Sequence, residues 1–261
     1  MNPLLYNYFV DKNQENSVDM TILCLLHELR IVSRTQLAKL LALDFVLTNK
    51  SIDRHIRKLF RQEMIDKLYN GKQVCYYLTK NGHDSIGGYY TLPKVPNYNL
   101  NHHLTINDYL IKTLNLVYNH PNLKFVLSER RQVFETKDLA KNNKGKKYFV
   151  PDFILRFRDK EGYEINWSFE IELTMKTRRR YWQGIFPKYI RELKENPSSR
   201  LIYVTPSPLI KEELERFRRM FIQKEGDEHN EIFQRLHIFS EDSFEKKLFL
   251  VLQDDPLADW H

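Results

Sequence analysis

Apolar residues recur with a helical period near the beginning of the chain. In the segment 18–30 the apolar stripe consists of Ile22, Leu23, Leu25, Leu26 and Leu29. This spacing predicts a first helix. Ser33 is placed to cap a second helix over 34–43, and Thr48 or Asn49 a third over 50–63. In the third helix the residues expected to face inward are Ile52, Ile56, Leu59 and Phe60.

Two strand-like runs follow the third helix. They cover 64–70 and 73–79, are joined by Gly71 and Lys72, and are closed by the segment NGHDSIGG at 81–88. Three helices and a β-hairpin predict a winged helix-turn-helix domain over 18–90, preceded by an N-terminal extension over 1–17. The segment YYLTKNG at 76–82 resembles the YxLTxxG pattern that closes the wing of many bacterial winged-helix regulators.

A change of pattern marks a second domain. The segment 91–101, TLPKVPNYNLN, has two prolines and no periodicity, which indicates a linker. Beyond it, helices are predicted over 104–119, 177–195, 209–221 and 243–252. Strands are predicted over 124–128, 130–135, 148–157, 163–174, 200–206 and 235–240. Strands interleaved with helices predict a mixed-sheet domain over 102–261, so the fold class is α/β, or α+β overall.

The composition is typical of a globular protein, with more basic than acidic residues. The chain has 261 residues, of which 42% are hydrophobic, enough for a core in one or two domains. No signal peptide or membrane-length apolar run is recognisable, and Cys24 and Cys75 have no CxxC partner, so a cytoplasmic location and no membrane partner are expected. Lys and Arg number 41 against 34 Asp and Glu, a net charge of +7, which favours a polyanionic partner.

The positive charge is concentrated in the third predicted helix. Its basic residues are Lys50, Arg54, His55, Arg57, Lys58 and Arg61. Such a helix fits the major groove of double-stranded DNA, although a solvated helix face is the simpler alternative. Lys67, Lys72 and Lys80 lie where a wing would contact backbone phosphate.

Three carboxylates fall within two predicted strands. Strand alternation places Glu170 and Glu172 on one face, and if the two strands pair, Asp152 lies beside Glu170. Two carboxylates and a backbone carbonyl, such as that of Ile171, would suit Mg²⁺, which could polarise a phosphodiester and activate water. A polar strand face at the edge of the sheet is the plainer alternative.

A basic run follows these carboxylates directly. Lys176, Arg178, Arg179 and Arg180 are expected in the first turn of a helix, where the macrodipole disfavours positive charge and a bound phosphate would relieve the cost. Tyr181 and Trp182 would add stacking surfaces or core. A further basic loop carries Lys141, Lys144, Lys146 and Lys147.

The P-D and E-x-E elements resemble the PD-(D/E)xK nuclease superfamily. In that superfamily the third position is usually lysine, where this chain has Glu172, and Lys176 is the nearest basic alternative. The resemblance implies a helix, three strands, a helix and a strand over 104–206. It also implies a catalytic set of Asp152, Glu170, Glu172 and Lys176, with Asp152 and Glu170 as ligands of Mg²⁺.

A wider set of motifs is similar to the plasmid replication-relaxation family. The matching positions are His103, Asn107, Asp108, Ser128, Glu129, Pro151, Asp152, Glu170, Glu172 and Thr174. The resemblance implies a DNA-binding protein of plasmid replication, DNA relaxation or mobilisation. His103, Asn107 and Asp108 are expected to begin and cap a helix rather than catalyse. Glu129 is either a metal-site acid or part of a salt bridge.

Three functions follow from these patterns. The first is a DNA-binding protein whose winged helix selects DNA and whose nuclease-like domain grips it, with replication or mobilisation proteins as partners. The second is a Mg²⁺-dependent endonuclease. The third is a non-catalytic transcription regulator, for which a homodimer is left open.

Overall fold

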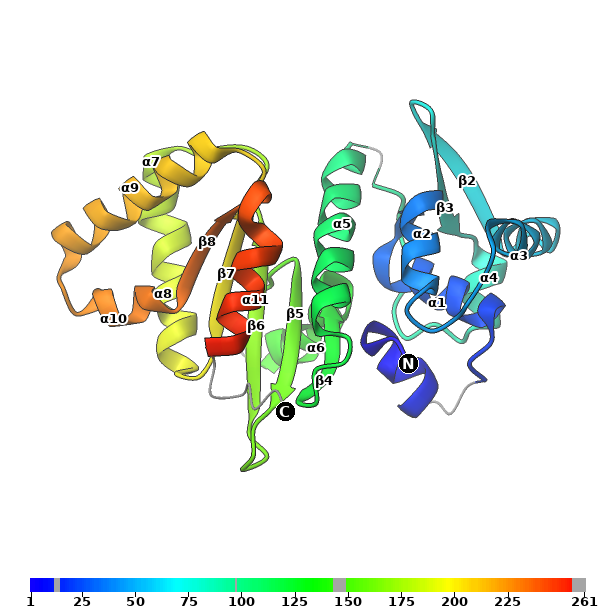
Figure 1. Cartoon of the computed structure of the whole chain (residues 1–261), viewed down its shortest axis with the longest axis horizontal. Coiled ribbons are helices and arrows are strands. Elements are labelled where there is room, and N and C mark those ends of the chain that lie inside the picture. The colour runs from blue at the N-terminus through cyan, green and yellow to red at the C-terminus, as the bar shows by residue number, and fades with distance from the viewer. Residues whose placement is uncertain (12–14, 97, 143–148, 255–261) are drawn as a thin grey trace. The chain divides into compact units, whose positions relative to one another are not determined.

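The computed structural model describes residues 1–11, 15–96, 98–142 and 149–254, which belong to two compact units (Figure 1). The first unit comprises Met1–Asn119 and Phe125–Asn142, and the second comprises His120–Lys124 and the chain from Asn143 onward. The mixed α/β class predicted from the sequence is confirmed. Along the described chain, every helix is too short or too polar to cross a bilayer.

The first unit begins with helices whose caps agree with the sequence. These helices are α1 (Val18–Leu29), α2 (Arg34–Leu41) and α3 (Asn49–Arg61). Ser33 forms a capping box with Gln36, and the Thr48 side chain accepts a hydrogen bond from the backbone N–H of Ser51. All five residues of the predicted stripe in α1 are buried, as are both cysteines.

A three-stranded antiparallel sheet accompanies these helices. Its order is β1 (Ile31–Ser33), β3 (Gln73–Leu78), β2 (Ile65–Asn70), and α4 (Lys80–Ser85) follows it. Asn70 pairs with Gln73, which leaves Gly71 and Lys72 as a two-residue turn. Gly71 has φ +59 whereas Lys72 has no positive φ, as a type II′ turn requires. The strand β1 had no counterpart among the sequence predictions.

The prediction that Phe60 faces the core of α3 is wrong. Its neighbours Ile52, Ile56 and Leu59 are buried, but Phe60 is 42% exposed. Leu59 already continues the buried row, and the next residue of a helix is rotated by about 100° away from it. The Phe60 ring instead makes a cation–π contact with Lys67, whose Nζ lies 5.4 Å from the ring centroid.

The first unit extends beyond the predicted winged-helix boundaries at both ends. The predicted N-terminal extension packs into the core, because Leu4, Leu5 and Tyr8 are almost completely buried. The Tyr8 hydroxyl donates a hydrogen bond to Glu28 of α1 at 2.9 Å. Helices α5 (Leu100–Val117) and α6 (Glu129–Asn142) also belong to this unit. The unit therefore continues past the predicted linker at 91–101.

Helix α6 replaces the strand predicted over 130–135. An ion pair of 2.6 Å joins Arg131 to Glu135, four residues apart, which is a helical spacing. The apolar residues Val133 and Phe134 are adjacent and both exposed, so the segment lacks the alternation of a half-buried strand.

Hydrogen bonds from polar side chains join α5 to β1 and α2 of the same unit. The buried Asn107 amide donates to the carbonyl of Ile31 at 2.8 Å. The Gln36 amide donates to the Leu104 carbonyl at 2.7 Å and to the Asp108 carboxylate at 2.8 Å. Asn107 and Asp108 thus lie two turns inside α5 and hold it in place. The prediction that they begin and cap the helix is wrong, because its N-cap is Asn99.

The second unit is built on a mixed five-stranded sheet with the order β4-β5-β6-β7-β8. The strands are β4 (Leu123–Ser128), β5 (Phe153–Arg158), β6 (Glu164–Ile171), β7 (Arg200–Thr205) and β8 (Leu236–Ser240). β5 and β6 are antiparallel, whereas β6, β7 and β8 run parallel. The division between the two units passes through β4.

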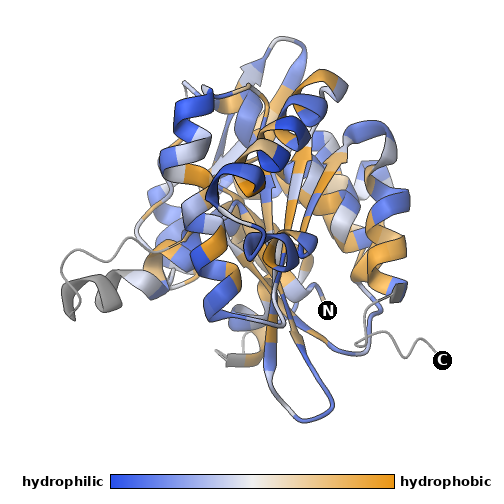
Figure 2. Cartoon of the chain, turned by 90° about the vertical axis from the view of Figure 1, so that its left-hand side faces the viewer, coloured by the Kyte–Doolittle hydropathy of each residue, from blue (hydrophilic) through white to orange (hydrophobic). Residues whose placement is uncertain are grey.

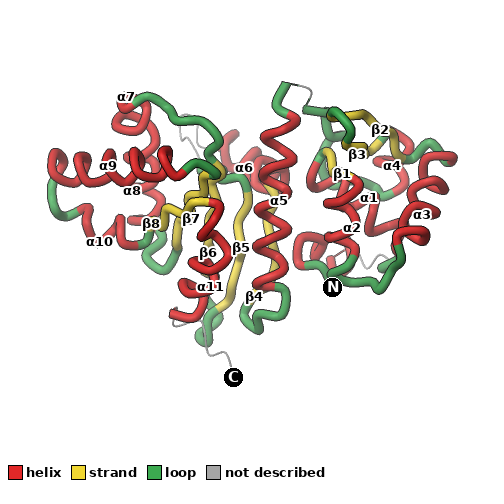
Figure 3. Tube along the Cα trace, turned by 45° about the horizontal axis from the view of Figure 1, so that its top comes forward, coloured by secondary structure: helices red, strands yellow, loops and turns green. Residues whose placement is uncertain are grey.

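Helices cover both faces of the parallel strands (Figure 3). They are α7 (Arg178–Arg180), a π-helical turn (Tyr181–Ile185), α8 (Phe186–Glu195), α9 (Pro208–Glu225), α10 (His229–Gln234) and α11 (Phe244–Asp254). Residues of α8, α9 and α10 form one core with Leu201, Tyr203 and Ile238, and on the opposite face of β8 Phe239 contacts Phe244 of α11. Apolar residues follow the strands and polar residues the outer turns of the helices (Figure 2).

Replacement of Asn107 by alanine tests how α5 is held. Asn107→Ala removes a buried donor and leaves the Ile31 carbonyl without it, so we expect a loss of about 1–3 kcal/mol in unfolding free energy. Urea denaturation of both proteins measures the difference. Asn115→Ala, an exposed position on the same helix, should change stability by less than about 0.5 kcal/mol. Equal effects of the two substitutions would contradict a fastening role for Asn107.

Candidate functional site

Helix α3 carries a row of exposed cations opposite its buried row. Lys50, Arg54, Arg57 and Arg61 are spaced i, i+4, i+7 and i+11, which places them on one helical face. We call these four residues the basic row. The buried Ile52, Ile56 and Leu59 lie on the other face. Among the described residues, no carboxylate forms an ion pair with any member of the basic row.

The other two basic residues of α3 are engaged within the protein. His55 Nδ1 lies 2.7 Å from Asp19 Oδ1, and Lys58 Nζ lies 2.5 Å from Asp19 Oδ2. Burial alone would raise the pKa of Asp19, but the hydrogen bonds from Lys58 and His55 outweigh it and lower that pKa. Both residues, predicted to bind DNA, therefore join α3 to α1 in the unliganded chain.

The β2–β3 hairpin adds cations near the basic row. Lys72 is exposed at the tip, in the two-residue turn. Lys67 contacts two aromatic rings, those of Phe60 and of the exposed Tyr69, at 5.4 and 5.7 Å from Nζ. Lys80 is exposed at the start of α4. The lysines assigned to a wing thus belong to the hairpin and the turn of helix after it.

Asp152 and Glu170 lie beside each other, as the sequence predicts. The antiparallel register pairs Phe153 with Phe169, so the next pair outward is Asp152 with Glu170. Asp152 Oδ2 accepts a hydrogen bond from the backbone N–H of Ile171 at 2.7 Å. Burial and then the negative charge of Asp152 raise the pKa of Glu170 to about 8. This perturbed pair is the strongest candidate for chemistry in the second unit.

Glu172 is held in a closed network next to this pair. It lies just beyond the end of β6, is 6% exposed, and its carboxylate accepts hydrogen bonds from Lys176 Nζ and from the Tyr203 hydroxyl, the latter at 2.8 Å. Lys176 precedes the helix, whose N-cap is Thr177, so its predicted position in the first turn is wrong. Its ammonium is paired with Glu172 in this state.

Two residues of α8 that the sequence analysis did not select also belong to this neighbourhood. The positive charge of Lys188 opposes the rise in the pKa of Glu170, more strongly than that of Lys176. Tyr189 is buried, and burial, then Glu170, Glu172 and Asp152, raise its pKa. Phe186, Tyr189 and Leu193 form an apolar stripe, which marks the face of α8 that covers the sheet. This stripe was the sequence signal that could have placed Tyr189 near the carboxylates.

The donor set at the carboxylate pair suits a hard cation. Asp152 and Glu170 supply carboxylate oxygens, which Mg²⁺ prefers, and a main-chain carbonyl with water would complete an octahedron. Within the described residues, no group of three or more His, Cys, Asp or Glu side chains is arranged to hold a metal ion. A metal here would therefore depend on two protein carboxylates.

The arginine run lies at the beginning of a continuous helical segment. Arg178, Arg179 and Arg180 are all exposed. The Arg178 guanidinium lies 4.5 Å from the centroid of the Trp182 ring, and Arg179 Nε donates to Gln183 at 3.0 Å. Tyr181 is fully buried and packs in the core rather than offering a stacking surface. Lys144, Lys146, Lys147 and the Lys141 side chain lie outside the described residues.

The remaining motif residues have structural contacts. Glu129 forms an ion pair of 3.0 Å with Arg30, and Ser128 donates a hydrogen bond to the buried Glu28 at 2.5 Å. Burial, then the charge of Arg30, lower the pKa of His103. Of the two readings of Glu129, the salt bridge is the one observed.

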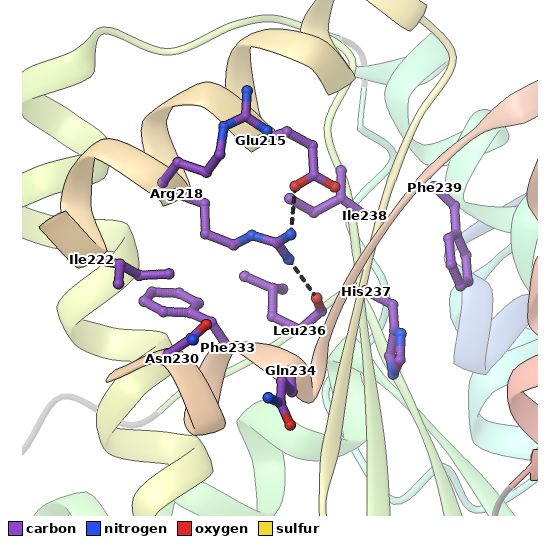
Figure 4. Close-up of a pocket in the computed structure, with 11 residues that line it drawn as sticks. Glu215, Arg218, Ile222, Asn230, Phe233, Gln234, Leu236, His237, Ile238 and Phe239 are labelled. Atoms are coloured by element: carbon purple, nitrogen blue, oxygen red, sulfur yellow. Dashed lines mark hydrogen bonds and ion pairs between the residues drawn. The ribbon is translucent and has the colours of Figure 1, made fainter. Parts of the chain in front are cut away.

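A separate pocket in the second unit lies between α9, α10 and β8 (Figure 4). Its volume is about 390 Å³. Arg218 extends across it, pairs with Glu215 at 2.6 Å and donates to the Leu236 carbonyl at 3.0 Å. The positive charge of Arg218 is thus matched by a neighbouring acid of its own helix.

Comparisons of this chain with protein-family models, with curated proteins and with solved structures found no match.

Replacement of Glu170 by glutamine tests the carboxylate pair. Because the pKa of Glu170 is raised in the folded state, the folded chain binds more protons, and the wild type should lose stability as the pH rises from about 4.5 to about 8. Glu170→Gln should therefore match the wild type near pH 4 and exceed it by roughly 2–4 kcal/mol at pH 8. Urea denaturation in EDTA across this range measures the effect.

Glu161→Gln provides the matched control, because Glu161 is exposed in the same unit. It should change the unfolding free energy by less than about 0.5 kcal/mol, as is usual for a surface substitution. A stability difference for Glu170→Gln that is the same at pH 4 and pH 8 would contradict the raised pKa.

Proposed function

We propose that this chain is a cytoplasmic DNA-binding protein of plasmid-type replication, DNA relaxation or mobilisation. The observation that carries the proposal is the basic row on α3, which lies opposite the buried row and forms no ion pair with an acid in the part of the chain that the structure describes. Arg and Lys contacts to phosphate and base edges are the main source of DNA affinity. The partner is double-stranded DNA.

The first unit acts as a winged helix-turn-helix with additional elements around it. In this proposal α3 enters the major groove and the hairpin tip at Lys72 contacts the backbone phosphates. The Asp19 carboxylate supports this geometry, since it holds His55 and Lys58 on the α1 side and orients the basic row outward. Rigid support of this kind favours recognition because less side-chain and backbone entropy is lost on binding.

The second unit acts as a PD-(D/E)xK-like domain that grips the same nucleic acid. Arg179 and Arg180 offer exposed guanidinium groups that suit phosphate, and Arg178 with Trp182 forms an adjoining cation–π surface. Replication or mobilisation proteins would act alongside it. A non-catalytic regulator would need only the first unit and a dimer surface, and it would leave the carboxylate pair of the second unit without a role.

The pair of Asp152 and Glu170 favours a second candidate, a Mg²⁺-dependent endonuclease. The two carboxylates would hold the ion, which supplies Lewis-acid polarisation of a phosphodiester when bound. Tyr203 and Lys176 fix the Glu172 carboxylate beside them, where it could orient water. Lys188 brings a further positive charge to the site.

Removal of two arginines from the basic row tests DNA binding. Arg54→Ala/Arg57→Ala should lower the slope of log affinity against log salt by about two, because each lost phosphate contact releases about one counterion less. Fluorescence anisotropy with a labelled duplex over a range of KCl concentrations measures the slope. Arg179→Ala/Arg180→Ala tests the second unit in the same way.

The matched control removes two exposed cations elsewhere, with Arg216→Ala/Lys246→Ala. These residues lie on α9 and α11, and the slope should stay unchanged. An equal fall in slope for the control would mean that net charge, and not the basic row, governs affinity.

Removal of the carboxylate pair tests the enzyme. Asp152→Asn/Glu170→Gln should reduce nicking of supercoiled DNA in Mg²⁺ or Mn²⁺ to the level seen with EDTA, while duplex binding in EDTA is retained, because the metal ligands are lost and the basic row is intact. Gel assays of cleavage and anisotropy of binding give the two readouts.

Asp227→Asn/Glu228→Gln repeats the chemical change at exposed acids of the same unit and should cleave as the wild type does. Binding by the wild type without cleavage in either metal supports the non-catalytic role. Cleavage that persists in Asp152→Asn/Glu170→Gln would remove these carboxylates from the reaction.

A further inference from the structure

The first unit contains a second pocket, larger than the one in Figure 4 and different in charge. It lies between α6, the segment 89–94 and Arg30 at the C-terminal end of α1. Its volume of about 780 Å³ is within the range of roughly 300–1,000 Å³ found for small-molecule sites. All of its lining residues belong to this unit.

One wall of the pocket is apolar and open to solvent. Leu92, Val133 and Phe134 line it and are 37%, 48% and 44% exposed. The Phe134 ring lies 5.1 Å from the Tyr90 ring, at an interplanar angle of 59°. Tyr90 is buried and already stacks on His27, whereas the exposed Phe134 ring can offer a face to a ligand. A planar aromatic group would cover this wall.

The pocket also carries three cations. Arg130 is 9% exposed, and its guanidinium donates hydrogen bonds to the carbonyl oxygens of His27 and Thr91. Carbonyl oxygens satisfy N–H groups but do not neutralise a charge. Arg30 pairs with Glu129 at 3.0 Å, and Lys94 is exposed at the rim.

The acids near these cations do not balance them. Glu129 is paired with Arg30, and Glu28 accepts hydrogen bonds from Tyr8 and Ser128 in the buried interior behind Arg130. Burial raises the pKa of the Glu28 carboxyl, and the charge of Arg130 is among the influences that oppose this rise. The described residues that line the pocket include these three cations and no acid, so the pocket surface has a surplus of positive charge that suits a phosphate.

We propose that this pocket binds a nucleoside monophosphate. The base would stack on Phe134 beside Leu92 and Val133, and the phosphate would lie among Arg30, Lys94 and Arg130. Guanidinium groups recognise phosphate through paired N–H donors, and bases stack on aromatic rings without sequence preference. The basic row on α3 contributes no residue to this pocket, so the proposal is independent of DNA binding.

Isothermal titration calorimetry on the full chain tests the site. The probes are AMP, adenosine, inorganic phosphate and N-acetylphenylalanine, which carries a ring and a carboxylate. AMP should bind, and adenosine and phosphate should each bind at least about tenfold more weakly, because each lacks one of the two recognised parts. N-acetylphenylalanine binding as tightly as AMP would overturn the nucleotide assignment in favour of an aromatic carboxylate.

Two surface variants locate the binding. Phe134→Ala and Lys94→Gln should each weaken AMP by about tenfold, through loss of stacking and of charge. The matched controls are Phe60→Ala and Lys39→Gln, exposed positions of the same unit outside the pocket, and they should bind AMP as the wild type does. All four positions are exposed, and circular dichroism verifies folding. No binding of AMP at millimolar concentration, or equal binding by the pocket variants, would overturn the proposal.

Discussion

The antiparallel register of β5 and β6 is the constraint on which the second unit depends. Pairing of Phe153 with Phe169 stacks two buried rings with centroids 4.4 Å apart and, one step outward, sets Asp152 against Glu170. Because side chains alternate along a strand, a slip of one residue would exchange the faces of the sheet to which the rings and the carboxylates point. The burial that stabilises the sheet therefore also fixes the acidic pair.

A similar coupling operates within the first unit. The buried row of Ile52, Ile56 and Leu59 sets the rotation of α3, and the opposite side of the helix then consists of the basic row. Asp19 strengthens the same orientation through His55 and Lys58. Substitution of a core residue would thus disturb the proposed DNA contacts indirectly, by rotating or loosening the helix that carries the cations.

The sequence was most informative where local chemistry decides the structure. Caps at Ser33 and Thr48, the turn at Gly71, and the alternation around Glu170 each involve residues that are neighbours in the chain or in one hairpin. It was least informative where a contact with a residue far along the chain determines the position or burial of a side chain.

Burial of Tyr8 depends on Glu28, and the position of Asn107 depends on a carbonyl 76 residues away. Six basic residues of α3 look alike in the sequence, yet a single acid on α1 separates two of them from the rest. Helix α6 lies where a strand was predicted, although the i, i+4 pair of Arg131 and Glu135 is a local helical signal; its contact from Arg130 to His27 joins residues far apart in the chain.

The net charge of +7 is not spread evenly, because ion pairs inside each unit neutralise some cations and leave others exposed. Acids neutralise cations inside each unit where they serve the fold: Asp53 holds Arg34, Glu172 holds Lys176, and Glu215 holds Arg218. Among the described residues, the basic row has no ion-pair partner, and the arginine run and Lys94 at the pocket of Arg130 are exposed to solvent. An even surplus would only aid solubility, whereas a surplus gathered at surfaces that also present aromatic or groove-sized features attracts phosphates. The placement of the acids, more than the number of lysines and arginines, therefore determines which cations stay exposed for the proposed contacts with anions.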